Sequence, residues 1–111
     1  MLTENPPPQR LKKGTLAAVT GLTSAALLLL TVPLEESGRK VSVDFAVDGT
    51  AHVAHVSGPQ YLQAYRDVAG IPTACDGLTA GIRMGQRYSE AQCAAMLEAE
   101  LVRHAEGVMR C

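Results

Sequence analysis

The stretch QYLQAYRDVAGIPTACDGLT, residues 60–79, sets an aromatic side chain, an acid, a glycine, a threonine and a cysteine close together. Ordinary turn and packing roles can account for each residue alone, because Asp67 can accept backbone N–H groups and Gly70 can turn the chain. Taken together, the same residues raise the question of whether this stretch forms half of an active site. The sequence on either side decides between the two interpretations.

Composition limits the classes of protein that fit. A chain of 111 residues holds one small domain at most. The net charge of -1 provides no electrostatic footprint for nucleic acid, so we expect no nucleic-acid partner. No cysteine or histidine pair has the spacing of a metal site, so neither a metal nor another cofactor is expected. The histidines, His52, His55 and His104, are interpreted as surface residues.

The run GTLAAVTGLTSAALLLLTVPL, residues 14–34, contains no charged residue. As a helix, rising about 1.5 Å per residue, it would match the hydrocarbon core of a bilayer. Basic residues precede it and Glu35 and Glu36 follow, so the positive-inside rule predicts a cytoplasmic segment 1–13, a signal-anchor helix 14–34 and an exported domain 35–111. A cleaved signal peptide and a buried core helix are the alternatives. Threonines, serine and glycines make the insertion of this anchor marginal.

After this run the sequence predicts a β-hairpin. Apolar residues alternate with smaller or polar ones from Val41 onward, and Asp48-Gly49 is a strong signal for a two-residue turn. A ribbon over 41–56 follows, whose ends Lys40 and Ser57 would lie side by side. The expected cross-strand pairs are Val47 with Thr50, Phe45 with His52, and Val43 with Ala54.

Two helices are expected beyond the hairpin. Pro59 occupies a tolerated early position for a short helix over 60–65. Ser89 with Gln92 forms a capping-box pattern at the start of a long terminal helix. Its apolar stripe is assigned to packing and consists of Cys93, Leu97, Leu101, Ala105 and Val108.

The motifs of residues 61–101 resemble the phage-type lysozymes, the glycoside hydrolase family 24 endolysins. The resemblance rests on Ala64-Tyr65-Arg66-Asp67, Gly70-Ile71-Pro72-Thr73, the turn 75–79, and the block from Gly85 through the helix start at 88–93. It implies an α+β, lysozyme-like fold with the N-terminal membrane helix, the inserted hairpin, the short helix, a β-turn region and the long helix. The family's further C-terminal helices are expected to be missing after Cys111.

The resemblance implies cleavage of the β-1,4 bond between N-acetylmuramic acid and N-acetylglucosamine in peptidoglycan, for lysis of a bacterial host. Asp67 would stay ionised beside the developing oxocarbenium ion, and Thr73 would help orient the attacking water. The weakly apolar N-terminal segment resembles the signal-anchor-release type. It implies a single-pass protein of the bacterial inner membrane, with the C-terminal part in the periplasm or released there.

The general acid departs from the family pattern, which places a glutamate nine positions before the aspartate, where this chain has Gly58. Glu36 is the preferred candidate, because a hairpin returns to its starting point and could bring the two segments together. Glu35 is the second choice. Both glutamates could instead simply flank the apolar run.

Three matters stay open at this level. Other functions are a truncated, inactive, membrane-tethered homologue and a holin-like membrane protein, although the latter leaves residues 64–79 unexplained. Hydrolysis and transglycosylation are not distinguished, because both need the same acid. An oxidising compartment permits a bridge between Cys75 and Cys93, but the pairing of three cysteines is undetermined.

Overall fold

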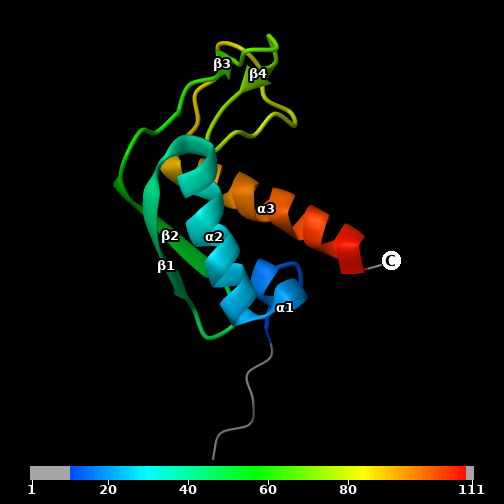
Figure 1. Cartoon of the computed structure of the whole chain (residues 1–111). Helices are drawn as coiled ribbons and strands as arrows, with labels where there is room; N and C mark the ends of the chain where they lie inside the picture. Colours follow the sequence, from blue (N-terminus) through cyan, green and yellow to red (C-terminus); the bar gives the residue numbers. More distant parts are fainter. Residues whose placement is uncertain (1–10, 110–111) are drawn as a thin grey trace, which may run out of the picture.

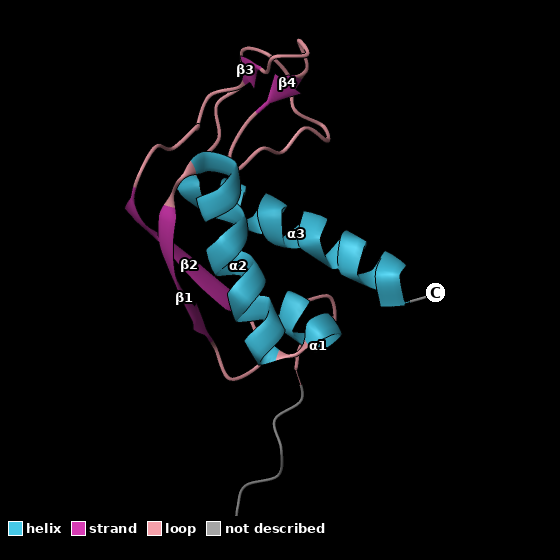
Figure 2. Cartoon of the chain, in the orientation of Figure 1, coloured by secondary structure: helices cyan, strands magenta, loops and turns pink. Residues whose placement is uncertain are grey.

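A computed structural model describes residues 11–109 of the chain, which contain helices and two small antiparallel sheets (Figure 1). The hydrophobic core is formed by the helices, the first of the two sheets and the loops that precede the last helix. The α+β prediction is confirmed. The elements, in chain order, are α1 (Leu16–Thr20), α2 (Leu22–Ser37), β1 (Lys40–Phe45), β2 (Ala51–Ser57), β3 (Tyr65–Arg66), β4 (Pro72–Thr73) and α3 (Glu90–Met109). Most of the chain between β2 and α3 consists of loops and turns (Figure 2).

The apolar run 14–34 does not form one continuous helix. Gly21, at φ 90° and ψ 158°, separates α1 from α2, because this backbone conformation cannot continue a right-handed helix. Leu16, Ala25 and Leu29 from the run are buried in the core. In the described part of the chain, no helix combines the length and apolar character that a membrane span requires. The structure does not support a single membrane helix over this run, which here forms the two packed helices α1 and α2.

Strands β1 and β2 form the predicted hairpin, with Lys40 paired to Ser57 as expected. The register inside it differs by one residue from the prediction, since Phe45 pairs with Ala51. The amide of Ala46 donates to the Thr50 carbonyl at 2.9 Å, so three residues form the loop instead of two. This register places Val43 opposite Val53 and keeps the apolar side chains on one face, which packs toward α2.

The predicted helix over 60–65 is also wrong, because these residues are extended. Their backbone groups bond to other segments: the Tyr61 carbonyl accepts from Cys75 at 2.8 Å, and the Leu62 carbonyl accepts from Tyr88 at 2.7 Å. These bonds satisfy groups that a helix would have paired internally. Strands β3 and β4 follow as a short hairpin.

Helix α3 begins with the predicted capping box. The Ser89 amide donates to Gln92 Oε1 at 2.8 Å, and the Gln92 amide donates to Ser89 Oγ at 3.0 Å. Cys93 and Leu97 of the predicted stripe are buried, Leu101 and Ala105 are partly buried, and the side chain of Val108 lies outside the described residues. Cys93 forms a disulfide with Cys75, which ties α3 to the loop after β4.

Candidate active site

The return of the hairpin brings residue 58 directly against the end of α2. A Cβ atom on Gly58 would lie 2.6 Å from the Gly38 carbonyl oxygen and 2.9 Å from Arg39 Cα. Gly58 also has φ 95°, which other residues rarely adopt. A glutamate therefore has no room at this position, where the family pattern has its acid. The backbone it touches belongs to the turn that immediately follows Glu36.

Glu36 lies in the last turn of α2 and faces the loop after β4. Its Oε2 lies 3.0 Å from the place where a Cβ on Gly77 would stand, so the carboxylate rests against a residue without a side chain. Gly77 has φ 78°. Glu36 lines a pocket of about 300 Å³. Its other lining residues come from α2, the loop 76–79 and α3: Val32, Asp76, Gly77, Leu78, Thr79, Leu97, Glu100, Leu101 and His104.

Asp67 and Thr73 lie at the hairpin of β3 and β4. Asp67 Oδ1 accepts the amides of Ala69 and Ile71, both at 2.9 Å, which fixes the side chain over the turn. Among the described residues, no protein donor bonds to Asp67 Oδ2. Thr73 is buried, pairs with Tyr65, and donates its hydroxyl to the Ile71 carbonyl at 2.8 Å. The structure thus brings Asp67 and Thr73 into one turn unit.

The Tyr65 hydroxyl is influenced by the charges of both Glu36 and Asp67. Burial raises the pKa of the Tyr65 hydroxyl, and Tyr61, Asp67 and Glu36 raise it further. The two carboxylates act on the hydroxyl because negative charges disfavour a phenolate nearby. Tyr65 therefore lies within electrostatic reach of both Glu36 and Asp67, although they are distant in sequence. Glu35 and Glu36 are both exposed, but Glu35 does not line the pocket of Glu36.

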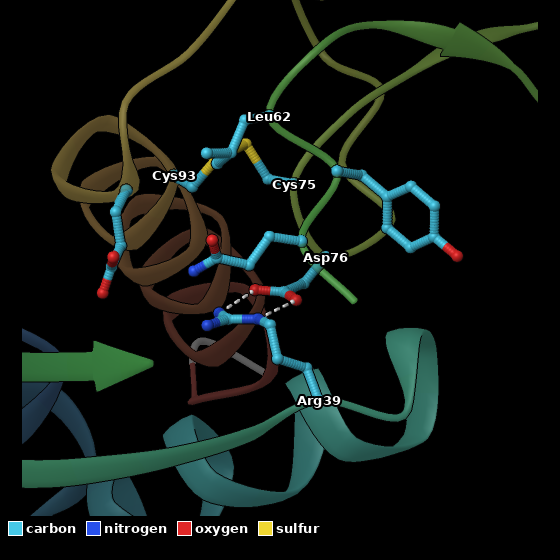
Figure 3. A pocket seen from close by; sticks show the side chains of 8 residues that line it. Arg39, Leu62, Cys75, Asp76 and Cys93 are labelled. Atoms are coloured by element: carbon cyan, nitrogen blue, oxygen red, sulfur yellow. Dashed lines mark hydrogen bonds and ion pairs between the residues drawn. A yellow bond between two sulfur atoms is a disulfide. The ribbon is translucent and has the colours of Figure 1, made fainter. Parts of the chain in front are cut away.

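A buried ion pair joins α2 to the loop that contacts Glu36 (Figure 3). Arg39 Nε and one terminal nitrogen donate to the two carboxylate oxygens of Asp76, at 3.0 and 2.8 Å. The other terminal nitrogen lies 3.3 Å from His55 Nδ1. The Arg39 and Asp76 side chains are 8% and 2% exposed. This two-pronged geometry is the strongest arrangement for an arginine and a carboxylate.

A second polar contact holds the N-terminus of α3 to β2. Glu90 Oε1 accepts the backbone amide of His55 at 2.9 Å. This hydrogen bond is the main reason that the pKa of Glu90 is lowered, since a donor stabilises the charged carboxylate.

Sequence reasoning missed Arg39, Asp76 and Tyr65 as members of the site. The sequence presents Asp76 as part of a turn, and nothing in it pairs Asp76 with an arginine 37 positions earlier. His52 and His104 are exposed as predicted, but His55 is half-buried beside Arg39. No group of three or more candidate metal ligands occurs among residues 11–109.

Comparisons with known proteins point to one family. Residues 57–111 match the sequence model of the family described as phage lysozyme. A protein named SAR-endolysin, from Pseudomonas phage phiKMV, is 54% identical over 33 residues, which are 30% of this chain and 21% of that protein. The matched region thus spans about a fifth of the relative's length. No solved structure matches the chain significantly.

Proposed function

Because residues 57–111 belong to the phage lysozyme family, we propose that the chain is an endolysin of the muramidase type. Its substrate would be peptidoglycan, and the bond cleaved would be the β-1,4 bond between N-acetylmuramic acid and N-acetylglucosamine. The observation that carries the proposal is this match, whose segment includes Asp67 and Thr73, together with the contact of Glu36 with Gly77 of the same segment. Glycoside cleavage needs such a pair of carboxyl groups on one site.

Glu36 is proposed as the general acid. It would donate its proton to the glycosidic oxygen as the bond from that oxygen to the anomeric carbon breaks. Two observations favour it over Glu35: its carboxylate contacts Gly77, and it lines the pocket between α2 and α3. The close packing of Gly58 against residues 38 and 39 supports the same assignment, because the acid must then come from another position.

Asp67 and Thr73 are proposed to act on the sugar and on water. The Oδ2 oxygen of Asp67 would face the positive charge that develops at the anomeric carbon, while Oδ1 stays bound to the turn amides. The hydroxyl of Thr73 donates to Ile71 and can still accept a hydrogen bond from a water molecule. That water would add to the anomeric carbon and release its proton to the deprotonated Glu36.

The test uses soluble peptidoglycan fragments and the full 111-residue chain. We expect the wild type to release new reducing ends, and Glu36→Gln and Asp67→Asn to lose about 100-fold or more in rate, as for removal of a positioned acid. Glu35→Gln is the matched control and should keep the wild-type rate. Equal rates for all four proteins would remove the assignment.

Two further measurements use the same proteins. Mass spectrometry of the products separates hydrolysis, which adds one water, from internal transglycosylation, which adds none. Sedimentation of the chain with insoluble peptidoglycan but no product from any variant would favour the alternative of an inactive homologue that only binds cell wall.

A further inference from the structure

Glu36 and Gly77 belong to two segments between which the described part of the chain forms no backbone hydrogen bond. Glu36 lies in the last turn of α2, and Gly77 lies in the loop after β4, 41 residues later by their numbers. A carboxylate on a terminal helical turn can move by an ångström or more unless its neighbours fix it. Something must therefore fix the end of α2 to this loop.

The end of α2 is itself well defined. Gly38 adopts φ 66° and donates its amide to the Leu34 carbonyl at 2.9 Å. The Arg39 amide donates to the Pro33 carbonyl at 3.2 Å, so the helix closes in a glycine cap. Arg39 is consequently the first residue after the cap, and its side chain moves with the turn that carries Glu36.

The loop that contains Asp76 and Gly77 is also fixed, by hydrogen bonds within it and by a disulfide to α3. The amide and carbonyl of Ala74 both bond to Leu78 at 2.9 Å, which closes a tight turn around Asp76 and Gly77. Cys75 has φ 59° and is bonded to Cys93 of α3. Asp76 and Gly77 therefore hold a fixed position relative to each other.

We propose that the buried pair of Arg39 and Asp76 positions Glu36 for catalysis. Arg39 lies three residues after Glu36, directly beyond the cap of α2, and Asp76 is adjacent to Gly77. Two parallel hydrogen bonds fix both distance and orientation, which a single bond or a surface ion pair does not. This inference rests on the proposed function. Arg39 is a positioning residue. Its Nε and one terminal nitrogen both bond to Asp76, so this side of the guanidinium does not contact substrate.

The pair is tested by replacing both partners together. Removing one partner would leave a buried charge and could unfold the protein, whereas an apolar pair of similar volume is often tolerated. The variant is therefore Arg39→Met with Asp76→Leu. Arg83→Met, at an exposed position outside the site, is the matched control for loss of an arginine. Arg39→Lys keeps the positive charge but cannot form the two parallel hydrogen bonds to Asp76.

The kinetic result separates positioning from folding. For the double variant we expect kcat on soluble peptidoglycan fragments to fall about 100-fold, with KM within about twofold, because a misplacement near 1 Å has that effect on rate. Arg39→Lys should lose about tenfold, and Arg83→Met should match the wild type. An unchanged kcat in a folded double variant overturns the inference, even when Glu36→Gln is inactive and the proposed function stands.

A second measurement does not need activity. Glu36→Gln should shift the amide resonance of Gly77 in an NMR spectrum, because the two groups are in contact. In the Arg39→Met, Asp76→Leu background, the same change should shift that resonance less than half as far. An equal shift in both backgrounds shows that Glu36 keeps its place without the pair and refutes the proposal. If Glu36→Gln is as active as the wild type, the proposed function fails while this result still judges the positioning.

Discussion

Loss of the disulfide between Cys75 and Cys93 should destabilise the chain by a predictable amount. The bridge closes a loop with a sequence separation of 18 residues. The chain-entropy relation then gives about 3 kcal/mol at 25 °C for the restriction that the bridge imposes on the unfolded state. With an unfolding entropy of about 2 cal/mol/K per residue, this loss corresponds to a fall in Tm of roughly 13 °C. The loop that contains Asp76 and Gly77 would also lose its covalent link to α3.

The assay compares two proteins by calorimetry and urea denaturation. Both carry Cys111→Ser, so that only one bridge can form, and one of them also carries Cys75→Ser with Cys93→Ser. The midpoint difference should reappear when the first protein is reduced, and the serine variant should not respond to reductant. A loss of less than about 1 kcal/mol in both comparisons would contradict the entropic argument, because loop closure alone requires more.

Three smaller changes test separate contacts. Gly77→Ala should lower stability by about 1 kcal/mol because residue 77 has a left-handed backbone conformation. It should also lower activity, since the new methyl group would press on the Glu36 carboxylate. Wild-type rates in a folded Gly77→Ala variant would argue against Glu36 as the acid. Ser89→Ala should cost about 1 kcal/mol in urea denaturation through loss of the α3 cap, and no change would mean that the cap is not formed in solution. The His55 amide lowers the pKa of Glu90 from 4.5, so the contribution of Glu90 to stability is complete above pH 4.5 and is lost as the pH falls through the lowered pKa. Glu90→Gln should abolish that part of the pH dependence of unfolding. Parallel unfolding profiles of the two proteins would show that the hydrogen bond is absent.

Local signals predicted the elements whose stabilising contacts are local. The capping box at Ser89 and the return of the hairpin from Lys40 to Ser57 were both predicted from short motifs. The hairpin register was not, because a two-residue and a three-residue loop share the same Asp-Gly signal and differ only in how the apolar faces meet the core.

Non-local contacts decided the remaining elements. Residues 60–65 are extended because carbonyls at Tyr61 and Leu62 accept from distant amides, which no window of sequence reveals. The apolar run 14–34 has the length and composition of a membrane helix, but Gly21 adopts a backbone conformation that divides it. The site followed the same division. Asp67 and Thr73, the proposed site residues, belong to one sequence motif, whereas Arg39 and Asp76 meet only in three dimensions.

Under the proposed function, the hairpin would explain how the acid Glu36 precedes Asp67 by far more than the family spacing. A two-stranded ribbon begins and ends at paired residues, here Lys40 and Ser57, so its length adds nothing to the separation of the chain segments at its base. The close approach of Gly58 to residues 38 and 39 follows from that closure. Under the proposed function, the chemistry would depend on the distance in space between Glu36 and Asp67. Any insertion that returns to its starting point leaves this distance unchanged, provided that glycine is present where the two segments meet.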